Sequence, residues 1–245
     1  MRQSNWISML VALTLIAIWE FFCGWFSIPD FILPAPSEVL RTTVDKAYLL
    51  LPHAGVTALE IIMGIFLSLM VAVPLATLMF ACPSMERALS PFLVASQAVP
   101  VFALAPLLVI WLGYGLASKV LMAAIIIFFP ITISLLEGYK NCDREYTVFF
   151  GLMGAGFWKK MRLLYWPWAL PYFFSGLKVG VTVATIGAVI GEWVGAQRGL
   201  GYLMIQANAR LQVSLVFAAI LCLSVMGLAM WVFVGFVEKK VIYWR

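Results

Sequence analysis

Six long apolar runs constrain the fold of this 245-residue chain more than any other feature. A transmembrane helix needs about 20 predominantly apolar residues. Runs of this kind lie at about 7–26, 54–81, 92–113, 118–136, 173–195 and 213–236. Because 64% of the residues are hydrophobic and 11% are charged, the composition excludes an ordinary soluble domain. The sequence therefore predicts an all-α, polytopic membrane protein with about six transmembrane helices.

Three of these runs admit a second interpretation. The stretch from Leu89 to Leu136 is interrupted only by GYGLASK, so it can be read as one segment, which would give five helices. Its glycines favour a turn between two spans, and we therefore predict six. The first run follows a basic start, as a signal peptide does, but it lacks a small-x-small cleavage site. Its length favours a helix that is retained.

The distribution of basic residues predicts the orientation in the membrane. With the N-terminus inside and six spans, five basic residues fall outside: Arg41, Lys46, Lys119, Arg198 and Arg210. The others fall on the cytoplasmic side: Arg2, Arg87, Lys140, Arg144, Lys159, Lys160, Arg162, Lys178, Lys239, Lys240 and Arg245. An excess of Lys and Arg in cytoplasmic loops is the usual arrangement. We therefore expect a multi-pass protein of the cell (inner) membrane with both termini in the cytoplasm.

The sequence carries no recognisable enzyme site. Its cysteines are scattered (Cys23, Cys82, Cys142 and Cys222), and its single histidine, His53, lies at a membrane boundary, so we expect no metal or other cofactor. GLMGAGFWKK lacks the spacing of a phosphate-binding loop. A net charge of +5 needs no nucleic acid to explain it. Residues 1–245 are expected to form one transmembrane domain, with a long cytoplasmic loop at about 138–171.

Three acidic residues lie in the expected spans, where ionisable groups are costly. Glu20 is near the end of the first span and can reach the interface. Glu60 and Glu192 lie deeper, and Glu192 precedes Trp193. Glu60, Glu192 and Trp193 are candidates for a translocation pathway, although a paired structural carboxylate also satisfies the rules of burial.

Other residues in the spans suggest a pathway lining and a packing face. Gln97, one turn before Pro100, is the neutral polar candidate for the pathway, and it can equally bond a neighbouring helix. Gly187, Gly191 and Gly195 recur at every fourth position. Small residues at this spacing let two helices approach closely.

The loop after the fourth span is too long for a simple helix connection. It predicts a short helix at about 144–153, a turn through 154–156 and a second helix from Phe157 towards Tyr165. Pro167 and Pro171 are expected to limit that second helix. The first helix carries an apolar group of side chains that would meet water unless another protein covered them: Val148, Phe149, Leu152 and Met153.

These residues resemble the cytoplasmic loop of permease subunits of ATP-binding-cassette importers. The family pattern is E-A-A, three residues, G, nine residues and I-x-L-P. Aligning Gly154 with the family glycine places Pro167 at the family proline. The E-A-A positions then fall on Val148, Phe149 and Phe150, so the acidic residue of the pattern is lost. The resemblance implies that these residues, with Met153 and Ala155, couple the permease to an ATPase.

The similarity extends over nearly the whole chain. ILPAPSEVL, ASQAVPVFALAPLLVIWLGYGLASKV and IGAVIGEWVGAQRGLGYLMIQANARLQ resemble permeases of the nitrate, sulfonate, taurine and thiamin-pyrimidine-precursor importers, and most of all the hydroxymethylpyrimidine type. The resemblance implies a type I importer permease fold, a homodimer, separate cytoplasmic ATPase subunits and an extracytoplasmic solute-binding protein. Cytoplasmic coupling helices would move with ATP binding. Nitrate, sulfonate or taurine is the alternative cargo.

Two other classes of protein remain possible from the sequence. Glu60 and Glu192 could serve an ion-coupled secondary transporter, in which uptake would survive ATP depletion. A membrane scaffold without transport activity would lack a co-purifying ATPase.

Overall fold

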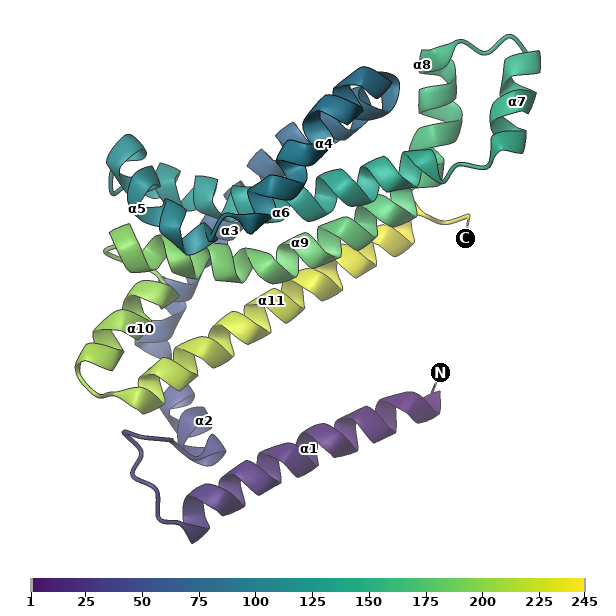
Figure 1. The fold of residues 1–245 in the computed structure, drawn as a ribbon. Coiled ribbons are helices and arrows are strands. Elements are labelled where there is room, and N and C mark those ends of the chain that lie inside the picture. The colour runs from purple at the N-terminus through teal and green to yellow at the C-terminus, as the bar shows by residue number, and fades with distance from the viewer. Residues whose placement is uncertain (1, 245) are drawn as a thin grey trace. The chain divides into compact units, whose positions relative to one another are not determined.

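The computed structural model describes the backbone of residues 2–244 and the side chains of residues 6–244. Arg245 and the Arg2 side chain, both used for the predicted orientation, therefore lie outside the described residues. Within this range every regular element is helical, which confirms the all-α prediction (Figure 1). The first six elements are α1 (Arg2–Trp25), α2 (Pro36–Asp45), α3 (Ala47–Ala81), α4 (Pro83–Ala98), α5 (Val101–Leu112) and α6 (Leu116–Lys140). The others are α7 (Arg144–Leu152), α8 (Phe157–Lys160), the π-helix η1 (Met161–Tyr165), α9 (Trp166–Gly195), α10 (Leu200–Ala209) and α11 (Val213–Val241).

The expected third span is bent. Five helical segments of the described chain are long and apolar enough to cross a membrane, and α4 and α5 together make a sixth only as a pair bent by 99°. The bend lies at Val99, which is extended (φ −74°, ψ 122°), and Pro100. A residue before proline is disfavoured in the α-helical region, and proline donates no backbone hydrogen bond. The apolar run predicted from the sequence is therefore present, but its direction changes halfway.

The expectation that Pro167 and Pro171 limit the helix after Phe157 is wrong. One continuous helical run extends from Phe157 to Gly195. Pro167 lies at the start of α9, directly after the wider π-helical turn of η1. In a regular α-helix the ring of Pro167 would collide with the carbonyl group of Leu163, four residues earlier. The π-helical turn contains Leu163 and changes the register at this point.

The chain divides into two compact units, and each is described by itself. The first comprises residues Met1–Val56 and Gln197–Ser224. In it the carboxylate of Glu20 accepts hydrogen bonds from the backbone N–H (3.0 Å) and the hydroxyl group (2.7 Å) of Ser37. Ser37 lies in the first turn of α2, where a negative charge is favourable. Glu20 is thus an anchor for α2 at the end of the first span.

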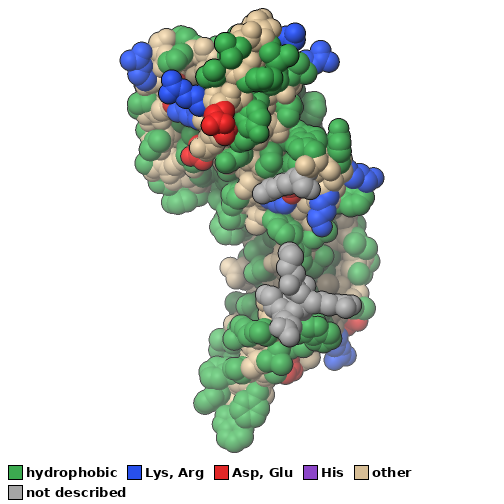
Figure 2. Space-filling model, turned by 90° about the vertical axis from the view of Figure 1, so that its right-hand side faces the viewer, with side chains coloured by type: hydrophobic (Ala, Val, Ile, Leu, Met, Phe, Trp, Pro, Cys, Tyr) green, Lys and Arg blue, Asp and Glu red, His purple; other side chains and the backbone are tan. Residues whose placement is uncertain are grey.

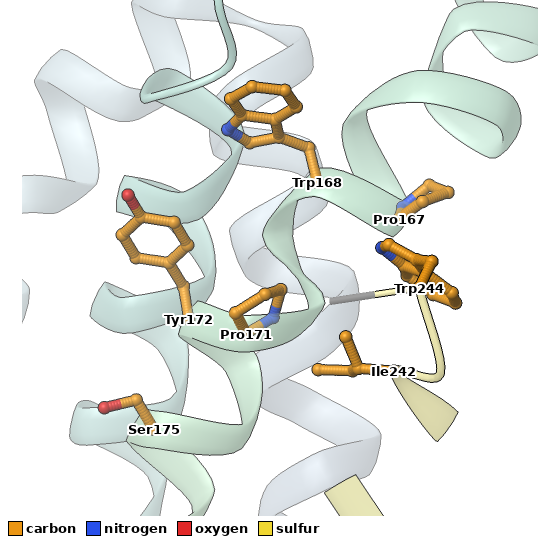
Figure 3. Close-up of a pocket in the computed structure, with 7 residues that line it drawn as sticks. All are labelled: Pro167, Trp168, Pro171, Tyr172, Ser175, Ile242 and Trp244. Carbon is orange, nitrogen blue, oxygen red and sulfur yellow. The ribbon is translucent and has the colours of Figure 1, made fainter. Parts of the chain in front are cut away.

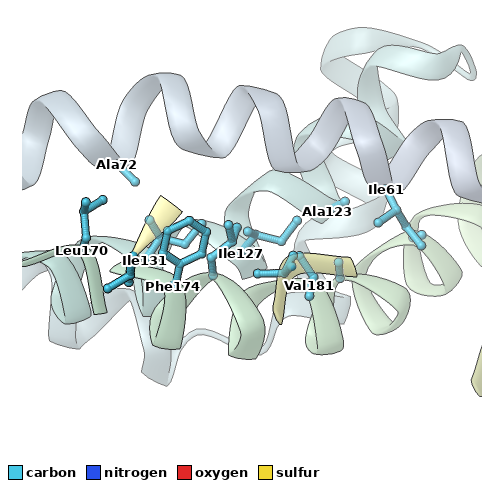
Figure 4. Packing of buried hydrophobic residues seen from close by; sticks show 13 residues of the cluster. Ile61, Ala72, Ala123, Ile127, Ile131, Leu170, Phe174 and Val181 are labelled. Atoms are coloured by element: carbon cyan, nitrogen blue, oxygen red, sulfur yellow. The ribbon is translucent and has the colours of Figure 1, made fainter. Parts of the chain in front are cut away.

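The second unit comprises residues Thr57–Ala196 and Val225–Arg245 and contains the main core. In it α6 and α9 lie side by side along much of their lengths (Figure 1). Figure 4 shows Ile127 and Ile131 of α6 facing Phe174 and Val181 of α9. Gly176 lets the backbones touch, because a Cβ atom there would lie 2.6 Å from the carbonyl oxygen of Pro130. This packed pair carries the α7–α8 segment at one end.

Candidate functional site

The segment between α6 and α9 is a defined structure with a capped helix at its start. The Asp143 carboxylate accepts a hydrogen bond from the backbone N–H of Glu145 at 3.0 Å and so caps α7. At the other end, Gly154 adopts the left-handed conformation (φ +71°). Its N–H bonds to the carbonyl oxygen of Gly151 (3.0 Å), and the Ala155 N–H bonds to that of Phe150 (3.0 Å). This paired pattern is a Schellman motif, which explains why a glycine stands at position 154.

The face of α7 beside this turn is apolar and exposed. Leu152 is 84% exposed and Met153 67%, and Val148 and Phe149 are each more than half exposed, whereas Phe150 is only partly exposed and Ala155 is buried. A shallow cavity of about 440 Å³ runs along the face, lined by Arg144, Glu145, Val148, Phe149 and Leu152. In Figure 2, charged side chains gather at the top, the end at which Figure 1 draws α7 and α8. An exposed apolar helix face among polar neighbours is typical of a site that binds another protein.

The base of this segment is closed by Trp168 of α9. Its indole Nε1 donates a hydrogen bond to the backbone carbonyl oxygen of Asn141 at 3.0 Å. Its ring also packs on that of Tyr146 in α7, with 5.7 Å between the ring centroids. A cavity of about 540 Å³ lies beside it, between residues 167–175 of α9 and the C-terminal residues Ile242 and Trp244 (Figure 3). Trp168 was not among the residues predicted from the sequence, although an indole donor beside two prolines was a visible signal.

At the opposite end of the α6–α9 pair, charged side chains from three helices meet inside the protein. Glu60 of α3 and Glu192 of α9 are each 1% exposed, and Lys119 of α6 is 7% exposed. The Lys119 Nζ atom lies 3.9 Å from Glu60 Oε1. Thr57, one turn before Glu60, donates a hydrogen bond to Glu192 Oε1 at 2.6 Å. We call Thr57, Glu60, Lys119 and Glu192 the buried charge cluster.

Close helix packing surrounds this cluster. A Cβ atom at Gly64 of α3 would lie 2.7 Å from the Cβ atom of Ala123 in α6. On the other side, a Cβ atom at Gly187 of α9 would lie 2.9 Å from the Ala123 Cα atom, and one at Gly191 would lie 3.2 Å from the Lys119 Cα atom. Helix α6 is therefore held between α3 and α9 at Ala123, and α9 also packs closely on it at Lys119. Gly195 completes the predicted stripe and faces Val109 of α5.

The four pathway candidates from the sequence lie in different environments. Glu60 and Glu192 lie together in the buried charge cluster, whereas Trp193 and Gln97 are both exposed. The Gln97 amide nitrogen contacts the neighbouring Ser96 hydroxyl at 3.4 Å, close to the bend after α4. Lys119 and Thr57 were missed as partners. Lys119 lies at the edge of an apolar run, where the side chain of a basic residue usually extends to water, so its position in the sequence did not indicate a buried ammonium group.

Comparison with known proteins decides which family the chain represents. The sequence profile of the family described as "Binding-protein-dependent transport system inner membrane component" matches residues 64–243. The chain belongs to this family. This permease is thus a multi-pass, non-catalytic membrane component of an ATP-binding-cassette importer.

Two similar proteins and one solved structure extend this result. The permease is 42% identical to a probable ABC transporter permease protein of Haemophilus influenzae, over 96% of each chain. It is 38% identical to the formylaminopyrimidine transport permease protein ThiX of Halalkalibacterium halodurans, over 96% of this chain and 94% of that one. A chain of the MetNI methionine ABC transporter, in an inward-facing conformation, superposes with a TM-score of 0.69 at 15% identity. The match covers 81% of this chain and 97% of the MetNI chain, and it confirms the expected type I importer permease fold.

Proposed function

We propose that this permease works as a homodimer and that its α7 face docks on a separate cytoplasmic ATPase subunit. The observation that carries the proposal is the exposed apolar face of α7, held in place by the Gly154 turn and by the Trp168 hydrogen bond. A helix of this kind fits a groove in a partner protein. The partner provides the ATP hydrolysis, and an extracytoplasmic binding protein delivers the solute.

The construction of the segment suggests how ATP binding moves the membrane helices. α8, η1 and α9 form one helical run, so a displacement of α8 is passed on to α9. Trp168 fastens α9 to the end of α6 at Asn141, so α6 and α9 move together. Rigid-body movement of packed helices is a common way to switch a protein between two states. In this permease it changes the access of the pathway from one side of the membrane to the other.

Replacement of exposed α7 residues tests the docking surface. In the double variant Leu152→Ser/Met153→Ser, we expect the ATPase to be lost from the purified complex and ATP-dependent uptake to fall at least tenfold. Both side chains are largely exposed, so the permease itself should remain folded. Val44→Ser, at an exposed apolar position of α2, is the matched control. Normal ATPase recovery and uptake in the double variant would disprove docking at this face.

For the solute, we propose a thiamin pyrimidine precursor of the hydroxymethylpyrimidine type. The similarity to a formylaminopyrimidine permease supports this assignment over most of the chain. Uptake into vesicles that contain the permease, its ATPase and its binding protein should saturate with hydroxymethylpyrimidine or formylaminopyrimidine. If only taurine, a sulfonate or nitrate were taken up, the proposed solute would be wrong, but the importer mechanism would still hold. Uptake that survives ATP depletion but collapses with a protonophore would instead indicate a secondary transporter.

A further inference from the structure

The carboxyl group of Glu60 lacks the partners that a buried carboxylate needs. Both of its oxygen atoms are buried, and no described residue donates a hydrogen bond to either one. The Lys119 Nζ atom, at 3.9 Å, is beyond hydrogen-bond distance. A buried ionised carboxylate without hydrogen bonds is strongly unfavourable, and the interior of a membrane offers no bulk water to replace them.

The charges around Glu60 also do not balance if every group is ionised. The groups that face it within the buried charge cluster are Lys119 from α6, Glu192 from α9 and Thr57 from its own helix. Two carboxylates and one ammonium group leave one uncompensated negative charge. Glu192 already accepts a hydrogen bond from Thr57, which stabilises its ionised form. Lys119 can compensate only one of the two carboxylates. Because a hydrogen bond stabilises ionised Glu192 and none from a described residue reaches the oxygen atoms of Glu60, we assign the surplus charge to Glu60.

The packing decides what can neutralise that charge. Gly64 brings α3 against Ala123, and Gly191 brings α9 against the backbone of Lys119. A Cβ atom at either glycine would already be too close to its neighbour, at 2.7 and 3.2 Å. Helices packed this tightly on both sides of α6 leave little room for a metal cation with its oxygen ligands. A proton needs no such space.

We propose that Glu60 is a proton-binding site, which carries one proton taken from water and makes the buried charge cluster neutral. The protonated carboxyl group can donate a hydrogen bond towards the carboxylate of Glu192, with which it interacts. The cluster then contains one ammonium group, one carboxylate and one neutral acid. This arrangement holds α3, α6 and α9 together at the end of the core opposite α7. The proposal does not depend on the docking of an ATPase.

Infrared spectroscopy of the full-length permease in lipid nanodiscs tests the proton directly. A protonated carboxyl group has a C=O stretch above the amide bands, and it should be present in the wild-type protein and lost in Glu60→Gln. Glu137→Gln, at an exposed glutamate of α6, is the matched control and should leave this band unchanged. The absence of a protonated carboxyl band from the difference between wild type and Glu60→Gln would overturn the proposal.

Thermal unfolding distinguishes a bound proton from an ion pair with Lys119 and from a bound sodium ion. Glu60→Gln mimics the protonated acid and should melt within about 2 °C of the wild type, whereas Lys119→Met should melt at least about 6 °C lower, since it leaves a buried carboxylate unpaired. Equal losses in the two variants would mean that Glu60 is the ionised partner of Lys119, and would contradict the proposal. A melting temperature that rises with sodium concentration in the wild type, but not in Glu60→Gln, would place a sodium ion there instead.

Discussion

Trp168 and Asn141 close the loop between α6 and α9 through one hydrogen bond, from the indole Nε1 atom to the backbone carbonyl oxygen at 3.0 Å. The bond joins the end of α6 to the start of α9 across 27 positions of the chain. Everything between the two residues, including α7 and its exposed face, is therefore attached to the membrane helices at a fixed base. The stiffness of this base should therefore determine how much of a displacement of α7 is transmitted to α6 and α9.

Trp168→Phe should weaken this base without removing the aromatic contact with Tyr146. Loss of one hydrogen bond costs about 0.5–1.5 kcal/mol, so the permease should remain folded. We expect fewer solute molecules transported per ATP hydrolysed in proteoliposomes that contain the whole importer. Trp158→Phe, at an exposed tryptophan of α8, is the control. Unchanged coupling in Trp168→Phe would show that the hydrogen bond does not transmit the movement.

The two glycines of the α7–α8 turn make a matched pair for a second prediction. Gly154 has φ +71°, whereas Gly156 has φ −65°, and a Cβ atom would meet no neighbour at either position. An alanine in the left-handed region costs about 1–2 kcal/mol. Gly154→Ala should therefore loosen α7, seen as faster amide hydrogen exchange in 144–153, and should lower ATP-dependent uptake. Gly156→Ala should change neither, and equal effects of the two variants would refute the role of backbone conformation.

Close packing of α9 on α6 gives a third prediction. A methyl group at Gly187 would lie 2.9 Å from the Cα atom of Ala123, which cannot move without its helix. Gly187→Ala should destabilise the permease by about 1–3 kcal/mol. Gly55→Ala in α3 is the control, because a Cβ atom there meets nothing within 4 Å. Thermal unfolding in one detergent measures both, and a Gly187→Ala variant as stable as Gly55→Ala would show that the helices adjust.

Cysteine labelling tests the orientation and the environment of two thiols. Cys82, between α3 and α4, and Cys142, after α6, both fall on the cytoplasmic side in the predicted orientation. A membrane-impermeant maleimide should label them in inside-out vesicles and leave them unlabelled in intact spheroplasts, once Cys23 and Cys222 are replaced by alanine. Labelling of either thiol from outside would reverse the predicted orientation.

The labelling rates should also differ in a way that depends on pH. A hydrogen bond with the Ser84 hydroxyl group lowers the pKa of the Cys82 thiol, and the Met85 backbone N–H acts in the same direction. Burial raises the pKa of the Cys142 thiol. Since the thiolate is the reactive form, Cys82 should react faster at neutral pH, and the difference should narrow as the pH rises. Ser84→Ala should slow the labelling of Cys82 and leave the labelling rate of Cys142 unchanged. A Cys82 labelling rate that is the same with and without the Ser84 hydroxyl group would contradict this prediction.

The sequence predicted best those features that depend on neighbouring residues. The α7 helix and its turn followed from a short apolar pattern and the glycines after it, and the structure has α7 at Arg144–Leu152 with Gly154 in the left-handed turn that follows it. The apolar runs were likewise visible, because hydropathy is a local sum. Pro100 was a visible signal for a kink in the third span, but the size of the bend was not predicted, since hydropathy counts apolar residues and contains no information on direction.

Features that depend on partners far apart in the chain could not be predicted in the same way. Glu60 and Glu192 were each recognisable as unusual residues, but nothing in either segment indicated that Lys119 would be buried beside Glu60. The expected effect of Pro167, to limit the helix that begins at Phe157, is likewise absent from the structure. A proline that normally limits a helix is accommodated by the π-helical turn before it, and that turn has no simple sequence signature.

The unbroken helical run from Phe157 to Gly195 has a mechanical consequence. At about 1.5 Å per residue, its 39 residues form a rod of about 58 Å, with the α8 end beside α7 and Glu192 near the other end. The π-helical turn and the two prolines lie within the first two-fifths of the rod, so the rod bends most easily near α8. The remainder is braced against α6 by close glycine contacts. A small rotation at α8 would therefore bend the helical run at the π-helical turn and the two prolines. The stiff remainder of the run would transmit torque to the buried charge cluster.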